Sequence, residues 1–306
     1  MLTIAYMTSR QDCRIEWFLS SLHRETGGDY TDIKIVVVDF WQKTRPQAFN
    51  LFNGSGRTIT HVSPKPSVWQ GEHRLTKEQW FAASNARNTA LCLAPDGHIA
   101  YCDDLSVLLP GWLARVREAM KRGTVTCGSY RKVKDLVVGT DGSITSFTDY
   151  PQGHDNRFGH GSDERAVSCG GGFLYGCSLV APVEAFLEVN GWPEICDGLS
   201  FEDVIVGIML EKKGWAIEYD RRMMSYESEE LHHFGPVMKR SDYGVSPNDK
   251  SHAVLKMAQQ GDGWHPGYWG EGGIRALRTR ILAGEPFPIC QTPEHEWFTS
   301  TPLRDL

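Results

Sequence analysis

Residues 98–104, HIAYCDD, decide the fold class because two adjacent acids follow a short apolar strand. Residues 84–88, SNARN, precede them within a predicted helix over residues 79–93. In an α/β protein the carboxyl ends of parallel strands border the ligand crevice, and paired carboxylates there suit a divalent cation. The alternative is a turn in which an aspartate caps the next helix, which begins near Pro110. A second acidic pair, Glu202-Asp203, and a histidine pair, His232-His233, favour the functional interpretation.

Strand-like and helical segments alternate through the first two thirds of the chain. Residues 34–39, KIVVVD, are apolar on both faces and predict a central parallel strand. A helix with apolar residues from Ile15 to Leu22 follows the first strand, and Asp12 is its expected cap. The remaining strands are predicted at residues 2–7, 58–62 and 99–102. This alternation predicts a doubly wound, mostly parallel sheet.

The rest of the chain is less regular. We expect a hairpin and a mobile loop over residues 134–165, and a strand-like glycine-rich run over residues 170–176 where a ligand or backbone approaches closely. Helices are predicted from Pro182 and over residues 201–213 and 274–282. The composition changes after His233, which predicts a catalytic domain over residues 1–235 and a C-terminal extension or lid over residues 236–306.

Composition narrows the class of protein. The chain has 306 residues, 41% of them hydrophobic, which is enough for a full core. Its net charge of -6 provides no overall attraction to nucleic acid or anionic membranes. The eight cysteines are scattered without zinc-ligand spacing, the first strand-like run leaves no room for a signal peptide, and no apolar stretch is long enough to span a bilayer. We therefore expect a cytoplasmic protein.

Several short segments, in this order and spacing, resemble the family-2-type glycosyltransferases with the GT-A fold. They lie at residues 4–10, 36–39, 86–88, 101–104, 109–112, 190–194, 201–203 and 213–215. The resemblance covers roughly residues 1–235 and implies an enzyme that moves a sugar from a nucleotide-diphosphate donor, with UDP-sugar as the expected donor.

The resemblance also implies a metal site. Charge builds on the departing diphosphate, and a divalent cation bridging both phosphates stabilises that charge. Asp104 would be a direct ligand of Mn²⁺ or Mg²⁺, and Asp103 a ribose partner or a further ligand. Either His232 or His233 would complete the site, although the doublet could also simply end a strand. The family often has Asp-x-Asp, whereas Leu105 stands at the last position here, which leaves the separate roles of the two aspartates open.

Donor recognition is expected at neighbouring strand ends. By resemblance, Asp39 accepts a hydrogen bond from the uracil or ribose, and Arg87 reaches the uracil or diphosphate. The base pocket would be lined by Thr8, Ser9 and Arg10. Trp192 would stack on the apolar face of the sugar. The alternatives are that Asp39 caps a turn, that Arg87 is a solvated helix side chain, and that the tryptophan is a packing residue.

The second acidic pair is expected to act on the acceptor. Asp203 would be the general base that takes the proton of the attacking hydroxyl, and Glu202 would bind acceptor or donor hydroxyls. A single base and a departing diphosphate predict direct displacement with inversion at the anomeric carbon. The helix dipole is expected to keep Asp203 ionised near neutral pH, and that dipole alone is the structural alternative for acids in a first helical turn.

Other functions fit the sequence less well. A dinucleotide oxidoreductase would carry G-x-G-x-x-G after the first strand, where residues 8–10 read TSR. A nucleotidyltransferase and a non-catalytic nucleotide-sugar-binding protein remain alternatives. The acceptor is open among a glycan, a protein, a small metabolite and a hydroxymethylated pyrimidine in phage DNA. DNA is the minority hypothesis, which rests on basic and aromatic residues between 239 and 280.

Overall fold

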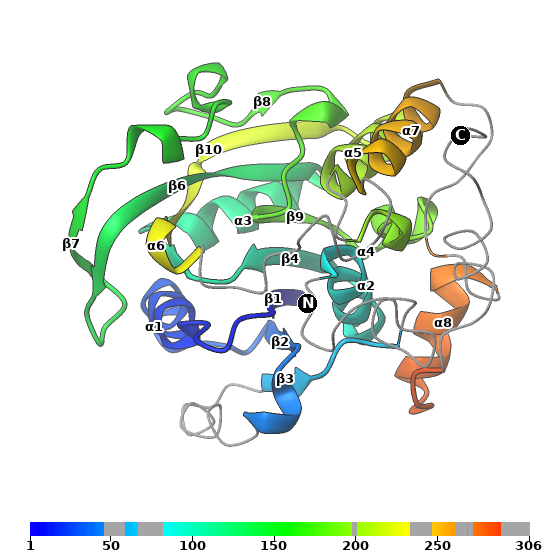
Figure 1. Cartoon of the computed structure of the whole chain (residues 1–306), viewed down its shortest axis with the longest axis horizontal. Coiled ribbons are helices and arrows are strands. Elements are labelled where there is room, and N and C mark those ends of the chain that lie inside the picture. The colour runs from blue at the N-terminus through cyan, green and yellow to red at the C-terminus, as the bar shows by residue number, and fades with distance from the viewer. Residues whose placement is uncertain are drawn as a thin grey trace.

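One mixed sheet of ten strands organises the chain (Figure 1). This computed structural model describes residues 1–45, 59–66, 82–197, 201–232, 247–260, 268 and 272–288. The main path of the sheet runs β3 (Ile59–Val62), β2 (Ile33–Asp39), β1 (Leu2–Thr8), β4 (His98–Asp103), β9 (Ser178–Pro182), β6 (Val125–Val138), β10 (Ile217–Ser228) and β5 (Ser106–Leu108). Two further strands, β7 (Ile144–Thr148) and β8 (Val167–Ser168), pair with β6 and β10.

The first half of the sheet is parallel, as its β-branched sequence predicts. β1 lies between β2 and β4, and all three run in the same direction. Thr8 is in register with Asp39, and Met7 is in register with Asp103. The carboxyl ends of these strands therefore meet at one edge, which is where ligands bind in open α/β sheets.

The second half of the sheet is mixed. β9 is antiparallel to both of its neighbours, β4 and β6. β6 and β10 are long and parallel to each other, and β5 pairs antiparallel to β10. Because β5 directly follows the Asp103-Asp104 turn, the distal end of β10 returns to the edge that carries these acids. Glu227 of β10 is in register with Ser106 of β5.

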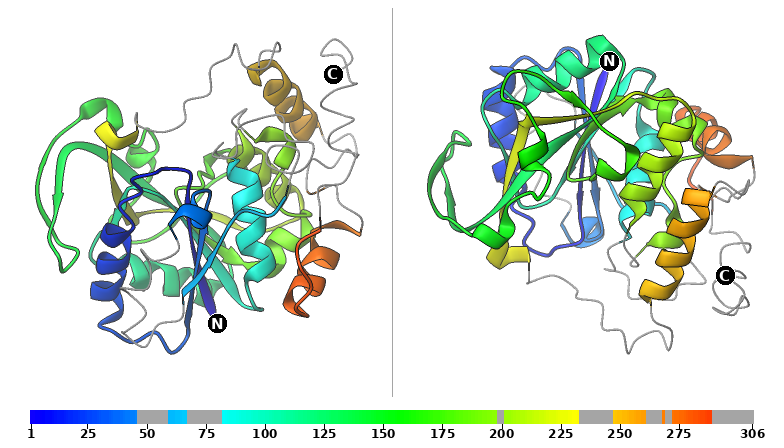
Figure 2. Two further views of the ribbon diagram at one scale, coloured as in Figure 1. Left: turned by 60° about the horizontal axis from the view of Figure 1, so that its bottom comes forward. Right: turned by 90° about the horizontal axis from the view of Figure 1, so that it is seen from above.

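Helices cover both faces of the sheet, as the side views show (Figure 2). One apolar cluster contains β1 side chains together with α1 (Ile15–Thr26) and α3 (Trp112–Arg122). The other contains the alternate β1 side chains with α2 (Ala83–Leu93), α4 (Val183–Glu188) and α5 (Glu202–Lys212). The short 3-10 turns are η1 (Gln42–Thr44), η3 (Pro151–Gly153), η4 (Phe158–His160), η5 (Gly171–Phe173) and η6 (Glu194–Cys196).

Two local predictions are wrong. Asp12 does not cap α1, because Arg14, in the left-handed conformation, occupies the position before the helix and no side chain caps it. Asp12 instead pairs with Arg14 at 3.0 Å. The run at residues 170–176 forms the turn η5 rather than a strand. Its glycines do permit the expected close backbone approach, because a Cβ on Gly171 would lie 2.2 Å from the carbonyl oxygen of Gly207 in α5.

Two helices lie beyond residue 235. α7 (Pro247–Gln260) lies against α5, where the Lys212 ammonium donates to the Gln259 carbonyl at 2.9 Å. α8 (Gly273–Leu282) packs on α2, and its Arg278 donates to the carbonyl of Ala94 at 2.8 Å. The sequence predicted α8, whereas α7 was not expected within the glycine-rich tail. The role of this extension as a lid remains a prediction.

None of the helices in the described part of the chain combines the length and apolar character that crossing a bilayer requires.

Candidate active site

Asp39 anchors the outer part of the candidate site at the end of β2. Its side chain is fully buried, and Oδ1 accepts a hydrogen bond from the Trp41 amide at 2.8 Å. Oδ2 pairs with Arg45 Nε at 3.2 Å and with His61 Nε2 at 3.1 Å. Asp39 therefore does cap the turn before Trp41, while it also gathers two basic side chains. Nothing in the sequence pointed to Arg45 or His61 as partners of this aspartate.

Asp104 lies at the centre of the same edge. Its Oδ2 accepts a hydrogen bond from the Thr8 hydroxyl at 2.7 Å, and its Oδ1 accepts one from Arg10 Nε at 3.0 Å. Burial raises the pKa of Asp104, and Arg10 opposes that rise. Arg10 also donates to the carbonyl of Leu231 at 3.0 Å. The guanidinium thus links the acidic turn to α6 (Glu229–His232).

Arg87 connects Asp103, at the end of β4, to the N-terminus of α5. Its Nη2 lies 3.3 Å from Asp103 Oδ1, and its Nη1 lies 2.9 Å from Glu202 Oε1. The arginine side chain is only 3% exposed. Burial alone would lower the pKa of its guanidinium, but Asp103 and Glu202 outweigh burial and keep that pKa above its ordinary value. Arg87 is therefore a buried, permanently charged bridge rather than a solvated side chain.

The Trp192 ring packs against the Arg87 guanidinium. This ring is fully buried, and the Arg87 guanidinium lies 4.6 Å from the ring centroid. Tyr101 and Phe186 pack on the same ring at centroid distances of 5.3 and 5.4 Å. The predicted role of Trp192 as a platform for the donor sugar is corrected, because a ring with no exposed surface cannot stack on a ligand.

Asp203 faces the turn that precedes β9. Its Oδ2 accepts the Gly176 amide at 3.3 Å, and its Oδ1 accepts the Val204 amide at 2.8 Å. Burial and the neighbouring Glu202 raise the pKa of Asp203 to about 7, and Arg87 opposes that rise. We expected the helix dipole to keep Asp203 ionised near neutral pH. This prediction is wrong, because burial has the larger effect on its pKa. A carboxyl with a pKa near neutrality is suited to general-base chemistry.

A side chain at position 176 would displace Arg87. A Cβ there would lie 2.2 Å from Nη2 of Arg87. The glycine-rich run thus brings a backbone amide to Asp203 and leaves room for the Arg87 side chain, whereas the sequence predicted the approach of a ligand or of backbone.

Glu227 is an acidic member of the site that the sequence did not single out. It is buried, and its Oε1 has no hydrogen-bond partner among the described residues. Burial, followed by Asp103, raises its pKa to about 8. The sequence showed only an acidic run at residues 227–230, and the register of β10 determines which of these acids points inward.

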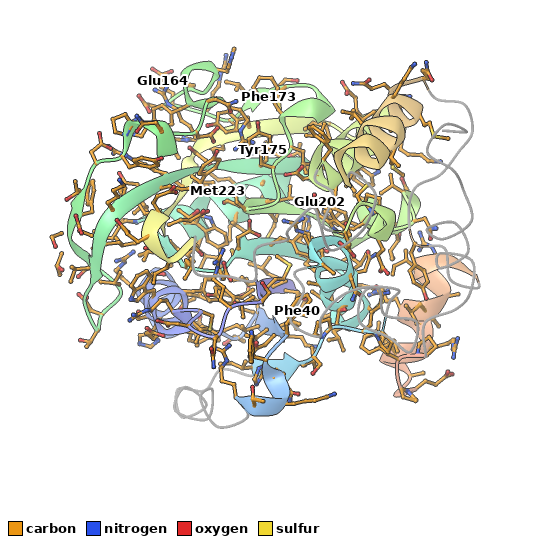
Figure 3. The ribbon with its side chains drawn as sticks, viewed as in Figure 1. Phe40, Glu164, Phe173, Tyr175, Glu202 and Met223 are labelled. Carbon is orange, nitrogen blue, oxygen red and sulfur yellow. The ribbon has the colours of Figure 1, made fainter. Side chains whose placement is uncertain are left out.

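The structure thus brings most predicted site residues together. Two clusters lie side by side, because Asp103 and Asp104 are adjacent in the chain: one contains Thr8, Arg10 and Asp104, and the other contains Arg87, Asp103 and Glu202, with Asp203 next to Glu202. Ser9 is buried beside the first cluster, and its carbonyl accepts the Trp41 indole at 2.9 Å. In the view of Figure 3, Glu202 lies over the sheet between Tyr175 and Phe40. His232 ends α6, with its side chain outside the described part of the structure, and His233 lies outside the described residues.

Comparison with known proteins identifies the fold. No protein-family model matches the sequence, and no curated protein matches it. Among solved structures, GalNAc-T7 with UDP, GalNAc and Mn²⁺ superposes with a TM-score of 0.58 at 12% identity, covering 97% of this chain and 56% of that one. Residues 1–349 of S. aureus TarS in complex with UDP-GlcNAc give 0.53 at 15% identity, covering 84% and 66%. TarS 1–349 alone gives 0.50 at 12% identity, covering 94% and 93%.

The chain therefore has the GT-A fold of these glycosyltransferases, as its sequence predicted. It spans 66% and 56% of the lengths of the TarS–UDP-GlcNAc and GalNAc-T7 chains.

Proposed function

We propose that this protein is an inverting glycosyltransferase that moves a sugar from a UDP-sugar to an acceptor hydroxyl with the help of a divalent cation. The observation that carries the proposal is the Arg87 bridge. One buried guanidinium joins Asp103, at the end of a parallel strand, to Glu202, which is adjacent to Asp203. Donor-binding and proton-accepting groups are thereby held on opposite sides of a single fixed charge.

UDP is the proposed nucleotide. The parallel strand ends present Asp39, with His61 and Arg45, beside the Thr8–Asp104 pair. The buried Asp39 would hold Arg45 and His61 in place, and their polar groups suit a nucleoside whose base and ribose offer hydrogen-bonding groups. The solved GalNAc-T7 and TarS structures with this fold contain UDP and UDP-GlcNAc.

The acidic edge fits a hard divalent cation. Asp103 and Asp104 supply carboxylate oxygens, which Mg²⁺ and Mn²⁺ prefer, and the nearby Glu227 has an unpaired buried oxygen. In the described residues no three acidic, histidine or cysteine side chains form a complete cation site by themselves. Asp103 and Asp104 would hold the ion, with His232 or His233 as a further ligand. The ion would neutralise charge on the diphosphate.

On the acceptor side, Asp203 is the proposed base. It would accept the hydroxyl proton while the oxygen attacks the anomeric carbon from the face opposite the diphosphate. The Gly176 and Val204 amides fix the orientation of its carboxyl group. Glu202, held by Arg87, would bind a sugar or acceptor hydroxyl.

A donor screen tests the proposal. The protein is incubated with Mn²⁺ and each common nucleotide sugar, and free nucleoside diphosphate is measured. We expect release from a UDP-sugar and its loss on chelation. Binding of the donor by calorimetry should weaken at least tenfold in Asp104→Ala, because a ligand of the ion is removed. Donor binding without any diphosphate release, with or without candidate acceptors, would favour a non-catalytic binding protein. Donor affinity indifferent to both chelator and Asp104→Ala would contradict a metal-bridged diphosphate.

The pH dependence of the reaction tests the assignment of the base. Asp203 must be ionised to accept a proton, and its pKa is about 7. We therefore expect kcat/KM to fall about tenfold per pH unit as the pH drops below 7, and to level off above it. Initial rates between pH 5 and pH 9 at low acceptor concentration measure this dependence of kcat/KM on pH. A flat profile from pH 5 to pH 7 would exclude Asp203 as the base.

A further inference from the structure

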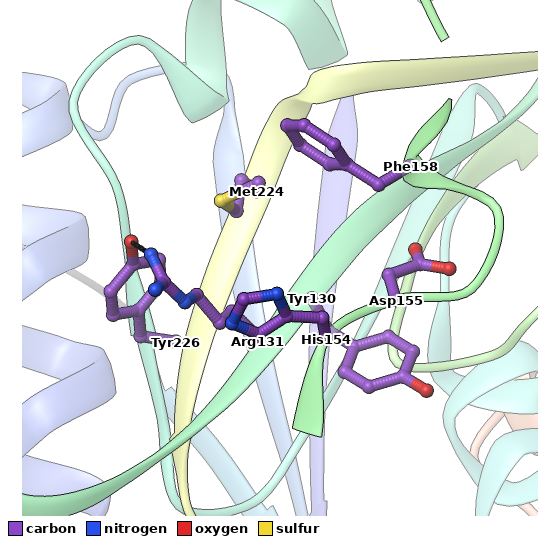
Figure 4. A pocket seen from close by; sticks show the side chains of 7 residues that line it. All are labelled: Tyr130, Arg131, His154, Asp155, Phe158, Met224 and Tyr226. Atoms are coloured by element: carbon purple, nitrogen blue, oxygen red, sulfur yellow. Dashed lines mark hydrogen bonds between the residues drawn. The ribbon is translucent and has the colours of Figure 1, made fainter. Parts of the chain in front are cut away.

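A cavity of about 400 Å³ lies between β6, β10 and the segment that follows β7 (Figure 4). Arg131 comes from β6, and Met224 and Tyr226 come from β10. His154 and Phe158 close it from the segment between β7 and β8. The volume is at the lower end of the range for small-molecule sites, which leaves room for one or two sugar rings.

Most of the cavity lies on the face of β6 and β10 opposite the acidic cluster, although Tyr130, which also lines it, lies near Glu227. On β6 and β10, Arg131 is in register with Tyr226, and the next pair is Lys132 with Glu227. Successive residues of a strand point to opposite faces. Glu227 belongs to the cluster around Asp103, so Arg131 and Tyr226 line the other face of the same two strands.

The walls are aromatic and partly open to solvent. Phe158 is 40% exposed and lines the cavity, and the Arg221 guanidinium lies 4.8 Å from its ring centroid. Tyr226 is held by edge-on packing of Phe147 at a centroid distance of 5.4 Å. A sugar ring has an apolar face that packs on such rings and hydroxyls that need nearby polar groups. Such polar groups line the cavity on Arg131, His154 and Asp155.

The charges beside the cavity are already compensated. Arg131 donates to Asp149 at 2.6 Å and to the Tyr226 hydroxyl at 2.9 Å. The ring of His154 pairs with the same aspartate at 2.9 Å. Arg221, which lies over the Phe158 ring, donates to Asp163 at 2.8 Å. A phosphate-rich polymer would need uncompensated cations. A neutral ligand fits these walls better.

We propose that this cavity is a second carbohydrate-binding site, which holds one neutral pyranose ring of a saccharide acceptor away from the donor crevice. Ring binding is independent of catalysis. Only the identity of the ring as part of the acceptor rests on the proposed glycosyl transfer.

Saturation-transfer NMR on the full chain tests the site without any turnover. The probes are the methyl pyranosides of glucose, galactose, mannose and N-acetylglucosamine, together with thymidine and 5-hydroxymethyl-2′-deoxycytidine, each with saturating UDP present. We expect saturation of at least one pyranoside, and a roughly tenfold weaker affinity in Phe158→Ala because the stacking face is lost. Leu282→Ala is the matched control, since Leu282 is 46% exposed on α8 and does not line the cavity.

Four results would overturn the proposal. They are no saturation of any pyranoside, a signal in Phe158→Ala equal to that of the original protein, a loss of affinity in Leu282→Ala equal to that in Phe158→Ala, and saturation of the nucleosides alone. The donor screen fails or succeeds separately, because it measures diphosphate release and this experiment measures binding with UDP present.

Discussion

The Asp203→Asn variant is expected to bind the donor normally and to transfer sugar about two to four orders of magnitude more slowly, the usual contribution of a general base. The amide is nearly isosteric with the carboxylate, but it cannot take the acceptor proton. Its oxygen can still accept one of the two hydrogen bonds from the Gly176 and Val204 amides. The measurements are single-turnover transfer rates and donor affinity by calorimetry. A near-normal rate, or a product that retains the anomeric configuration of the donor, would contradict the assignment.

Stability distinguishes loss of the base from loss of the fold. Burial raises the pKa of Asp203 from 3.8 to about 7 in the folded protein. The folded state therefore binds the proton more tightly than the unfolded state, and the cost of the buried charge is fully present above pH 7. Asp203→Asn removes that charge, so its unfolding temperature at pH 8 should equal or exceed that of the original protein. Glu202→Gln is the comparison variant, for which we expect a smaller loss of rate.

The parallel half of the fold could be predicted because each of its strands is recognisable from a short continuous stretch of sequence. A run such as residues 34–39, apolar on both faces, fits a buried parallel strand and little else. Once the strands are parallel, their carboxyl ends must share an edge. Asp39 and Asp103 then fall on that edge without any knowledge of side-chain contacts.

The links across the site could not be predicted in the same way. Arg87 and Glu202 are 115 positions apart, and only the tertiary fold brings their side chains within hydrogen-bond distance. Trp192 followed a glycine, as a sugar-stacking residue can, but its neighbours Tyr101 and Phe186 enclose it. Composition cannot tell a buried aromatic ring from one that faces a ligand. The inward position of Glu227 depends on the register of β10, which pairs with segments that are distant in the sequence.

Loss of Arg87 is expected to have the largest effect on stability. The guanidinium is the only positive group that the described structure places in direct contact with both Asp103 and Glu202, and it also opposes the raised pKa of Asp203. Its removal leaves the carboxylates of Asp103 and Glu202, which are 32% and 16% exposed, and the buried Asp203 without their shared cation. Breaking a buried ion pair from one side costs about 3–5 kcal/mol, because the remaining charge loses its compensation.

We therefore expect Arg87→Met to lower the free energy of unfolding by about 3–5 kcal/mol at pH 8. The deficit should shrink at pH 5, because the pKa of Asp203, already about 7, rises further without the arginine and the carboxyl takes up a proton. Arg87→Lys should recover part of the stability but little transfer, since an ammonium cannot span two carboxylates as a guanidinium fork does. The matched control is Arg117→Met. Arg117 pairs with Asp32 at 2.8 Å while 45% exposed, so the loss there should stay below about 1 kcal/mol. Urea unfolding of the three variants at both pH values measures these differences. Equal losses of unfolding free energy in Arg87→Met and Arg117→Met would mean that the Arg87 bridge between Asp103 and Glu202 does not stabilise the site.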